Sequence, residues 1–202
     1  MHSNIRIAIL ASGNGTNAQQ IVEYFQGKDT IEVACILYNR KDAFVATRAQ
    51  RLGVPAEYVS PATFRQSTEI AKILDTFMAD YLILAGFLQL VPTSIIAQYP
   101  SHILNIHPAL LPNYGGKGMY GHHVHEAVIG NHEVESGITV HLVDDHYDHG
   151  QILFQARCKI TPTDTADTLA EKIHVLEKTY FPSVIESYIL NLPMPVQEHP
   201  IE

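Results

Sequence analysis

The chain has 202 residues, and its hydrophobic content of 46% is enough for one α/β domain with a full core. Its formal net charge of −8 argues against a nucleic-acid binder or a membrane-surface protein, although backbone amides can still hold a phosphorylated small molecule. Two cysteines inside apolar runs, Cys35 and Cys158, a start without a signal-peptide pattern and apolar runs too short to span a bilayer predict a cytoplasmic protein.

In the first half, short apolar runs alternate with segments of helical periodicity. Strands are expected at Ile5–Ala11, Ile31–Tyr38, Ala56–Val59, Tyr81–Ala85 and His102–Ile106. Helices are expected at Ala18–Phe25, Ala43–Leu52, Phe64–Met78 and Pro92–Tyr99. This alternation predicts an α/β fold with a mostly parallel, Rossmann-like sheet and helices on both faces.

After Pro112 the pattern changes. The glycines of Asn113–Gly121 predict a mobile loop, and a short polar turn between two strand-like runs predicts an antiparallel pair. The remaining expected elements are a helix at His122–Ile129, strands at Gly137–Val143 and Gln151–Ile160, and a helix at Thr168–Leu190 interrupted near Pro182. We expect a single domain over residues 1–202, with two halves that meet near residue 100 and a frayed tail at 191–202.

The motif at the end of the fifth strand is Asn105-Ile106-His107-Pro108. Proline ends the strand, and the side chains of Asn105 and His107, two residues apart, point to the same face. Open α/β sheets place their chemistry at the carboxyl ends of strands, so these two residues are a candidate site. The alternative is that both only satisfy hydrogen bonds in the turn.

The turn Gly13–Asn17 follows the first strand and opens a helix. Glycines permit close backbone approach, and the helix start offers free N–H groups, so this turn suits a phosphate. Asn39-Arg40-Lys41 stands where a dinucleotide fold needs an acidic residue, which disfavours NAD but leaves NADP open. A mononucleotide or sugar phosphate fits better, and a helix start without a ligand stays possible.

The polar turn Asp144–Gly150 carries three aspartates. If it folds over the end of the fifth strand, one carboxylate can reach His107 and favour its imidazolium form. An amide and an imidazolium could then stabilise an oxyanion. The sequence has no G-x-S-x-G nucleophile motif, so the attacking atom should belong to a substrate or to water.

Several histidines raise the possibility of a metal site, but no H-E-x-x-H motif or cysteine partner accompanies them and their spacing is irregular. We expect no metal and interpret them as surface or loop residues. They are His122, His123, His125, His132, His141, His146 and His149.

These motifs resemble the folate-dependent glycinamide ribonucleotide (phosphoribosylglycinamide) formyltransferase family over nearly the whole chain. The most specific run is the one from Asn105 to Pro112 (N-I-H-P-x-L-L-P), and the turn Ser12–Asn17 separates this branch from related enzymes. Further matches are Leu84–Phe87, Thr139–His141, Asp148–Gly150 and Glu177–Pro182.

The resemblance implies formyl transfer from 10-formyltetrahydrofolate, as co-substrate, to the amine of glycinamide ribonucleotide in purine biosynthesis. It makes 1–100 the phosphate-binding half and 101–190 the catalytic and folate-binding half of a monomer or homodimer. His107 would be the proton donor, Asn105 a second oxyanion donor, and Asp148 the group that raises the His107 pKa. The implied phosphate ligands are Gly15, Thr16 and Asn17, with Glu177 on the ribose. The implied folate contacts are Arg65, Leu88, Gln89, Leu90, Val91 and Asn105.

The chain also departs from the family pattern. Gln89 stands where arginine is common, His149 where a small residue is common, and the loop Gly115–Gly121 is long. The rival functions are formyltetrahydrofolate hydrolase, methionyl-tRNA formyltransferase, which carries a further RNA-binding domain, and an NADP-dependent oxidoreductase or nucleotide-binding module.

Overall fold

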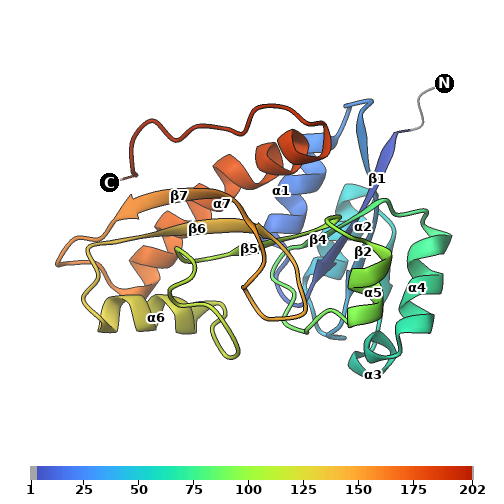
Figure 1. Ribbon diagram of the computed structural model, residues 1–202, viewed down its shortest axis with the longest axis horizontal. Helices are drawn as coiled ribbons and strands as arrows, with labels where there is room; N and C mark the ends of the chain where they lie inside the picture. The colour runs from blue at the N-terminus through green and yellow to red at the C-terminus, as the bar shows by residue number, and fades with distance from the viewer. Residues whose placement is uncertain (1–3, 202) are drawn as a thin grey trace. The chain divides into compact units, whose positions relative to one another are not determined.

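The computed structural model describes residues 4–201, which form two compact units, 4–105 and 106–201 (Figure 1). The strand β5 (Ile103–His107) begins in the first unit and ends in the second. Across the described residues, no helix is both long enough and apolar enough to cross a membrane.

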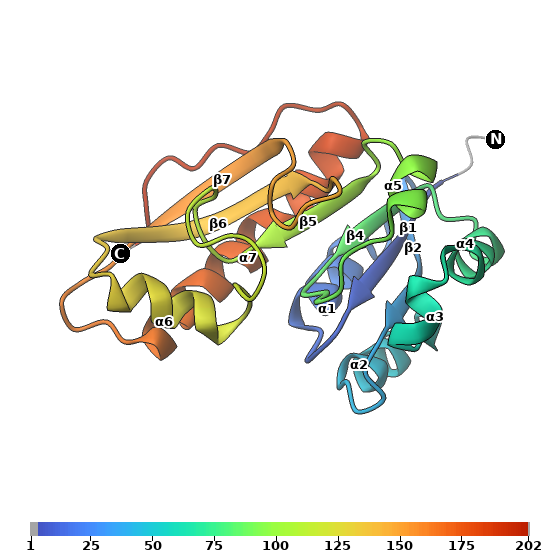
Figure 2. The same cartoon turned by 60° about the horizontal axis from the view of Figure 1, so that its bottom comes forward.

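The first unit contains a parallel sheet in the order β3-β2-β1-β4-β5, flanked by α1 on one side and by α4 and α5 on the other (Figures 1 and 2). The central strand β1 has five consecutive residues that are at most 1% exposed, as expected for a strand covered on both faces. The other elements are α1 (Thr16–Phe25), β2 (Ile31–Tyr38), α2 (Val45–Leu52), β3 (Ala56–Tyr58), α3 (Pro61–Arg65), α4 (Ser67–Thr76), β4 (Tyr81–Leu84) and α5 (Thr93–Gln98), with β1 at Ile5–Ala11.

The prediction of a single helix over Phe64–Met78 is wrong, because two shorter helices, α3 and α4, occupy residues 61–76. Ser60 begins α3 by accepting the backbone N–H of Thr63 on its hydroxyl at 3.0 Å, with proline at the first helical position. Gln66 then takes a non-helical ψ of 89°, and α4 begins after it. The predicted apolar face survives the break, since Phe64, Ile70 and Leu74 are all buried.

The second unit contains the antiparallel pair β6 (Glu135–Leu142) and β7 (Ile152–Lys159), which confirms the pairing expected from the short turn between them. Their register runs from Glu135 opposite Lys159 to Val140 opposite Phe154. The helix α6 (His122–Gly130) contacts α7 (Ala166–Ile189), and α7 also packs on both strands (Figure 1).

Two expectations for the end of the chain are wrong. The helix α7 continues through Pro182 without interruption, held by the buried side chains of Phe181, Val184 and Ile185 around the proline. The tail is not frayed over its whole length, because Ile201 forms a parallel bridge with Cys158 and exchanges backbone hydrogen bonds with the neighbouring strand residues. The expected fold class, a mostly parallel sheet with an antiparallel strand pair, is confirmed.

Candidate functional site

His107, the last residue of β5, is held by two acceptors within the second unit. Its Nε2 lies 2.8 Å from the carbonyl oxygen of Tyr114, and since a carbonyl only accepts, this nitrogen must carry a proton. Its Nδ1 lies 3.4 Å from Oδ2 of Asp148. The side chain of His107 is only 4% exposed, so water does not screen either interaction strongly. The ring is therefore held between an acceptor on each of its two nitrogens.

Asp148 is the carboxylate that the turn between β6 and β7 brings to His107. Besides His107, it faces Nε2 of His141 at 3.7 Å and accepts the backbone N–H of Gly116 at 3.0 Å. Burial alone would raise the pKa of Asp148, but the hydrogen bonds from His107 and His141 and from Gly116 hold the pKa well below its usual range. Asp148 is therefore an anion near neutral pH.

Backbone geometry fixes the position of Asp148. Its φ of 54° lies in the left-handed region, which aspartate tolerates better than most residues. The loop passes so close that a Cβ on Gly115 would lie 2.6 Å from Leu111 Cδ2 and 3.2 Å from the Cβ of Asp148. A side chain at position 115 would have to displace the Leu111 side chain, so glycine suits the close approach of the loop to Asp148, a role for the loop that its sequence does not indicate.

The segment after His107 is fastened to β6 and β7 by side chains that sequence reasoning did not single out as site residues. The buried hydroxyl of Thr139 accepts the N–H of Leu111 at 3.0 Å and donates to the carbonyl of Ala109 at 2.7 Å. The amide of Gln155 donates to Thr139 and to the carbonyl of Leu111. The interpretation of His125 and His141 as surface or loop residues is wrong, because both are buried. A histidine within an apolar strand, as His141 is, is a detectable signal of a buried polar role.

The phosphate-binding candidates lie at the start of α1 in the first unit. Gly15 is the N-cap with φ 77°, and Thr16 is the first helical residue. Thr16 is exposed and Asn17 is half-buried, and both lie in the first turn, whose N–H groups have no intrahelical partner. A Cβ on Gly15 would lie within 3 Å of Val45, whereas one on Gly13 meets open space.

Arg48 from α2 brings a positive charge to this turn and was not expected from the sequence. Its Nε donates to the carbonyl of Asn14 at 2.8 Å and its Nη2 to the side-chain oxygen of Asn14 at 3.0 Å. Its Nη1 donates to Gln19. The guanidinium therefore both fixes the turn and favours an anion beside it.

The expected folate contacts at 88–91 form a loop tied to the phosphate turn. The N–H of Leu88 donates to the hydroxyl of Ser12 at 2.9 Å. Leu88 and Leu90 are 43% and 42% exposed, which leaves two apolar side chains available to a flat ring, whereas Val91 is buried. The side chain of Gln89 accepts from Asn39 at 2.9 Å.

Arg65, Asn105 and Glu177 complete the expected set. Arg65 is an exposed residue at the end of α3, and this helix reaches the 86–91 loop through the ring contact of Phe64 with Phe87, 4.7 Å between centroids. Asn105 is a half-buried residue of β5, and Glu177 is a buried carboxylate of α7. Each lies within a regular element that fixes its backbone.

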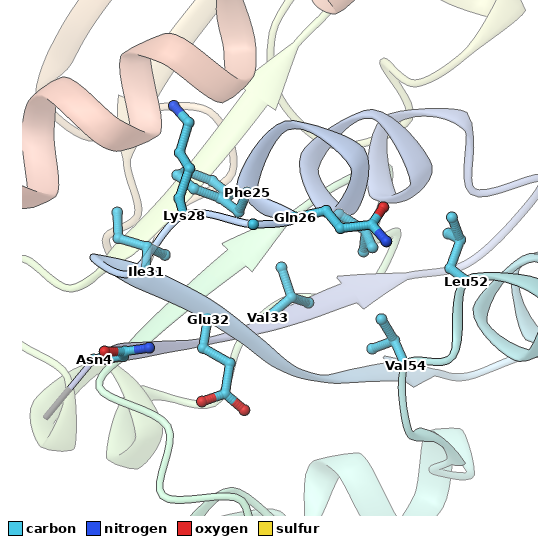
Figure 3. A pocket seen from close by; sticks show the side chains of 11 residues that line it. Asn4, Phe25, Gln26, Lys28, Ile31, Glu32, Val33, Leu52 and Val54 are labelled. Atoms are coloured by element: carbon cyan, nitrogen blue, oxygen red, sulfur yellow. The ribbon is translucent and has the colours of Figure 1, made fainter.

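A separate cavity of about 270 Å³ opens in the first unit near the amino ends of β1 and β2 (Figure 3). Phe25, Ile31, Val33 and Val54 are among its lining residues, and none of the expected site residues belongs to the lining. The cavity lies at the amino ends of these strands, whereas α/β folds hold their ligands at the carboxyl ends.

Comparison with known proteins shows which family the chain belongs to. Residues 5–185 match the family model described as formyl transferase. The chain is 37% identical over 183 residues to a chloroplastic phosphoribosylglycinamide formyltransferase of Arabidopsis thaliana, covering 87% of this chain and 62% of that protein. It is 30% identical to the phosphoribosylglycinamide formyltransferase of Escherichia coli, covering 90% of this chain and 85% of that protein.

Solved structures agree. The phosphoribosylglycinamide formyltransferase of Coxiella burnetii matches with a TM-score of 0.84 at 34% identity, covering 93% of this chain and 88% of that one. The glycinamide ribonucleotide transformylase 1 of Symbiobacterium toebii matches with a TM-score of 0.85 at 30% identity, covering 100% and 94%. The chain spans less than two thirds of the length of the two plant relatives, 62% and 60%.

Proposed function

Because the chain belongs to the formyl transferase family, we propose that it moves the formyl group of 10-formyltetrahydrofolate to the amine of glycinamide ribonucleotide, yielding the N-formyl product and tetrahydrofolate. The observation that carries the chemistry is the buried His107, held between the Asp148 carboxylate and the Tyr114 carbonyl. The names of the relatives support the choice of acceptor.

In the proposed reaction, the amine nitrogen forms a bond to the formyl carbon, and the formyl oxygen becomes an oxyanion. The Nε2–H of His107 donates to this oxygen in place of the Tyr114 carbonyl, and the Asn105 amide is the second donor. The bond from the carbon to the folate nitrogen then breaks. The amine loses one proton and the leaving nitrogen gains one, so protons balance.

Asp148 is assigned an electrostatic role. Its charge is secured by three hydrogen-bond donors, and it faces the ring nitrogen of His107 that does not meet the substrate. A fixed anion there stabilises the imidazolium that an oxyanion requires. His141 shares Asp148 with His107 and so positions the carboxylate rather than touching the substrate.

Binding is divided between the two units. In the first unit, Gly15, Thr16 and Asn17 would hold the substrate phosphate with Arg48 nearby, and Arg65 with Leu88, Gln89, Leu90 and Val91 would contact the folate. In the second, Glu177 would contact the ribose. The exposed leucines and the free helix N–H groups support these assignments. We also propose a cytoplasmic location and a reaction without a metal.

The deciding experiment incubates the chain with 10-formyltetrahydrofolate in the presence and absence of glycinamide ribonucleotide, followed by absorbance. Folate turnover only when both are present supports the proposal. Formate release without the amine indicates a hydrolase instead, and no turnover of folate in either case contradicts formyl transfer.

The phosphate assignment has its own test by calorimetry. Thr16→Val removes an exposed hydroxyl at the first position of α1, and we expect at least tenfold weaker binding of glycinamide ribonucleotide with unchanged folate affinity. Thr93→Val is the matched control, because Thr93 is the exposed first residue of α5. Equal affinities for the wild type and Thr16→Val would contradict a contact by this hydroxyl.

A further inference from the structure

The side chains of Asp144, His146 and His149 converge on the turn between β6 and β7. Each of the three residues offers one possible ligand atom, and these three atoms all lie within 4.8 Å of one another. Among residues 4–201, no other group of three possible ligands meets this criterion. We propose that this turn binds a divalent transition-metal ion through one carboxylate oxygen and two imidazole nitrogens. The inference does not depend on the proposed function.

Contacts within the turn already hold Asp144 in place. Its Oδ1 accepts the backbone N–H of His146 at 2.9 Å, so the carboxylate is fixed by its own turn. Its Oδ2 lies at hydrogen-bonding distance, 2.8 Å, from Nδ1 of His149, so this ring is already beside the second carboxylate oxygen. The rings of His146 and His149 lie 5.6 Å apart between centroids.

The separation of the donors fits a small ion after a minor rotation. Zinc lies about 2.0–2.2 Å from nitrogen and oxygen ligands, so two ligands of one ion are about 4 Å apart at most. The donors here are within 4.8 Å, and the side chains of His146 and His149 are 71% and 74% exposed, so no packed side chain has to move when the rings rotate. Closing the gap needs no backbone change.

A second carboxylate supports one of the proposed ligands. Asp145 Oδ1 lies 2.8 Å from Nδ1 of His146, which leaves Nε2 as the nitrogen of this ring that an ion could bind. A carboxylate behind the ligating imidazole is the arrangement that orients histidines at metal sites and makes them stronger donors. This feature distinguishes the turn from a casual group of charged side chains.

The donor set selects the class of ion. Two imidazoles and one carboxylate suit Zn²⁺, Co²⁺, Ni²⁺ and Cu²⁺, whereas Mg²⁺ and Ca²⁺ prefer oxygen ligands throughout. The two cysteines do not compete, because both are buried and burial raises the pKa of Cys35 to about 12 and that of Cys158 to about 11. We therefore use Zn²⁺ as the probe.

The other histidines that the sequence singles out for metal binding are arranged differently. His122 and His123 each face Glu126, at 3.7 and 3.3 Å, and His125 is buried. His132 is an exposed residue with φ 56°, a conformation that asparagine also adopts readily. His132→Asn is therefore a matched control for histidine removal.

The test is calorimetric titration of Zn²⁺ into the full, metal-stripped chain. We expect one site, at least tenfold weaker binding in His146→Asn and in His149→Asn, and a dissociation constant within twofold of wild type in His132→Asn. Asp144→Asn keeps the oxygen that caps the turn but removes the charge, and should also weaken binding. Residues 132, 144, 146 and 149 all lie outside helices and strands. The circular dichroism spectra of the four variants should therefore match that of the wild type.

A second readout locates the ion directly. Substoichiometric Co²⁺ should broaden the imidazole proton resonances of His146 and His149 before those of His132. No binding of Zn²⁺ at millimolar concentration would overturn the proposal. So would equal affinity in the wild type and the two histidine variants, or first broadening at another histidine.

Discussion

Nδ1 of His107 lies 3.4 Å from Oδ2 of Asp148, and the two side chains are only 4% and 11% exposed. One ends a parallel strand and the other sits in the turn of an antiparallel pair. A carboxylate that is so little exposed depends on the groups beside it, because their removal leaves its charge without compensation.

Asp148→Asn should reduce turnover at least a hundredfold with Michaelis constants little changed. Asparagine keeps the size of the side chain and tolerates the left-handed backbone at this position, so the charge is the main property lost. Without it the imidazolium form of His107 is less stable, and the alkaline limb of the pH–rate profile should move to lower pH. Steady-state kinetics between pH 5 and 10 measure both effects. Normal turnover with an unmoved alkaline limb would make Asp148 a turn residue.

Gly15→Ala should lower the free energy of unfolding by about 2 kcal/mol or more. The φ of 77° costs alanine about 1–2 kcal/mol, and its methyl group would overlap Val45. Gly13→Ala is the control, because a Cβ there meets open space and its φ is not positive. Urea unfolding of both variants should show a loss at position 15 only. Equal losses would mean that the turn as a whole resists side chains.

His125 should make the protein less stable as pH falls from 7 to 4. Burial, with smaller contributions from His174, His122 and His107, lowers the pKa of His125 to about 4, whereas the unfolded value is about 6.5. Between these values the unfolded state binds more protons, so stability rises with pH there and is lost on acidification. Urea unfolding at pH 7 and 4.5 should show a smaller difference in His125→Gln than in wild type. His123→Gln, at an exposed position, should retain the wild-type difference, and the same difference in both variants would contradict the assignment.

Exhaustive chelation should leave the rate of formyl transfer unchanged. The proposed donors are the imidazole of His107 and the amide of Asn105, and the side chains of Asp144, His146 and His149 take no part in the proposed reaction. Rates measured before and after dialysis against a chelator, with Zn²⁺ added back to a portion, give the comparison. A loss that Zn²⁺ restores would show that the chemistry needs a metal.

Much of the fold was predictable from local pattern. The strands at Ile5–Ala11 and Ile31–Tyr38 have the expected bounds because continuous apolar runs between turn residues leave little choice for a buried parallel strand. The break at Gln66 was not predictable, since the apolar periodicity continues across it and only the cap at Ser60 indicates a separate start.

The residues of the candidate site that belong to a sequence motif were predictable. Those that reach the site only through contacts between distant parts of the chain were not. His107 and Asp148 follow from motifs, and the structure brings them together. Arg48 and Gln155 act through partners far away in the sequence, and nothing in their local pattern distinguishes them from surface or strand residues. Thr139 lies in a run that matches the family, but the run does not indicate its hydrogen bonds to Ala109 and Leu111. Tertiary hydrogen bonds of this kind carry no periodic signal.

The bridge between Ile201 and Cys158 covers part of the outer edge of β7. β7 is the last strand of its sheet, and an uncovered last strand invites pairing with another molecule. Here Gln197 accepts the N–H of Arg157, while Ile201 donates to the carbonyl of Arg157 and accepts the N–H of Lys159. The segment near residue 200 thus occupies hydrogen-bonding positions on β7 that a strand of another molecule could otherwise use. It hinders the edge-to-edge strand pairing that leads to fibre-like aggregation.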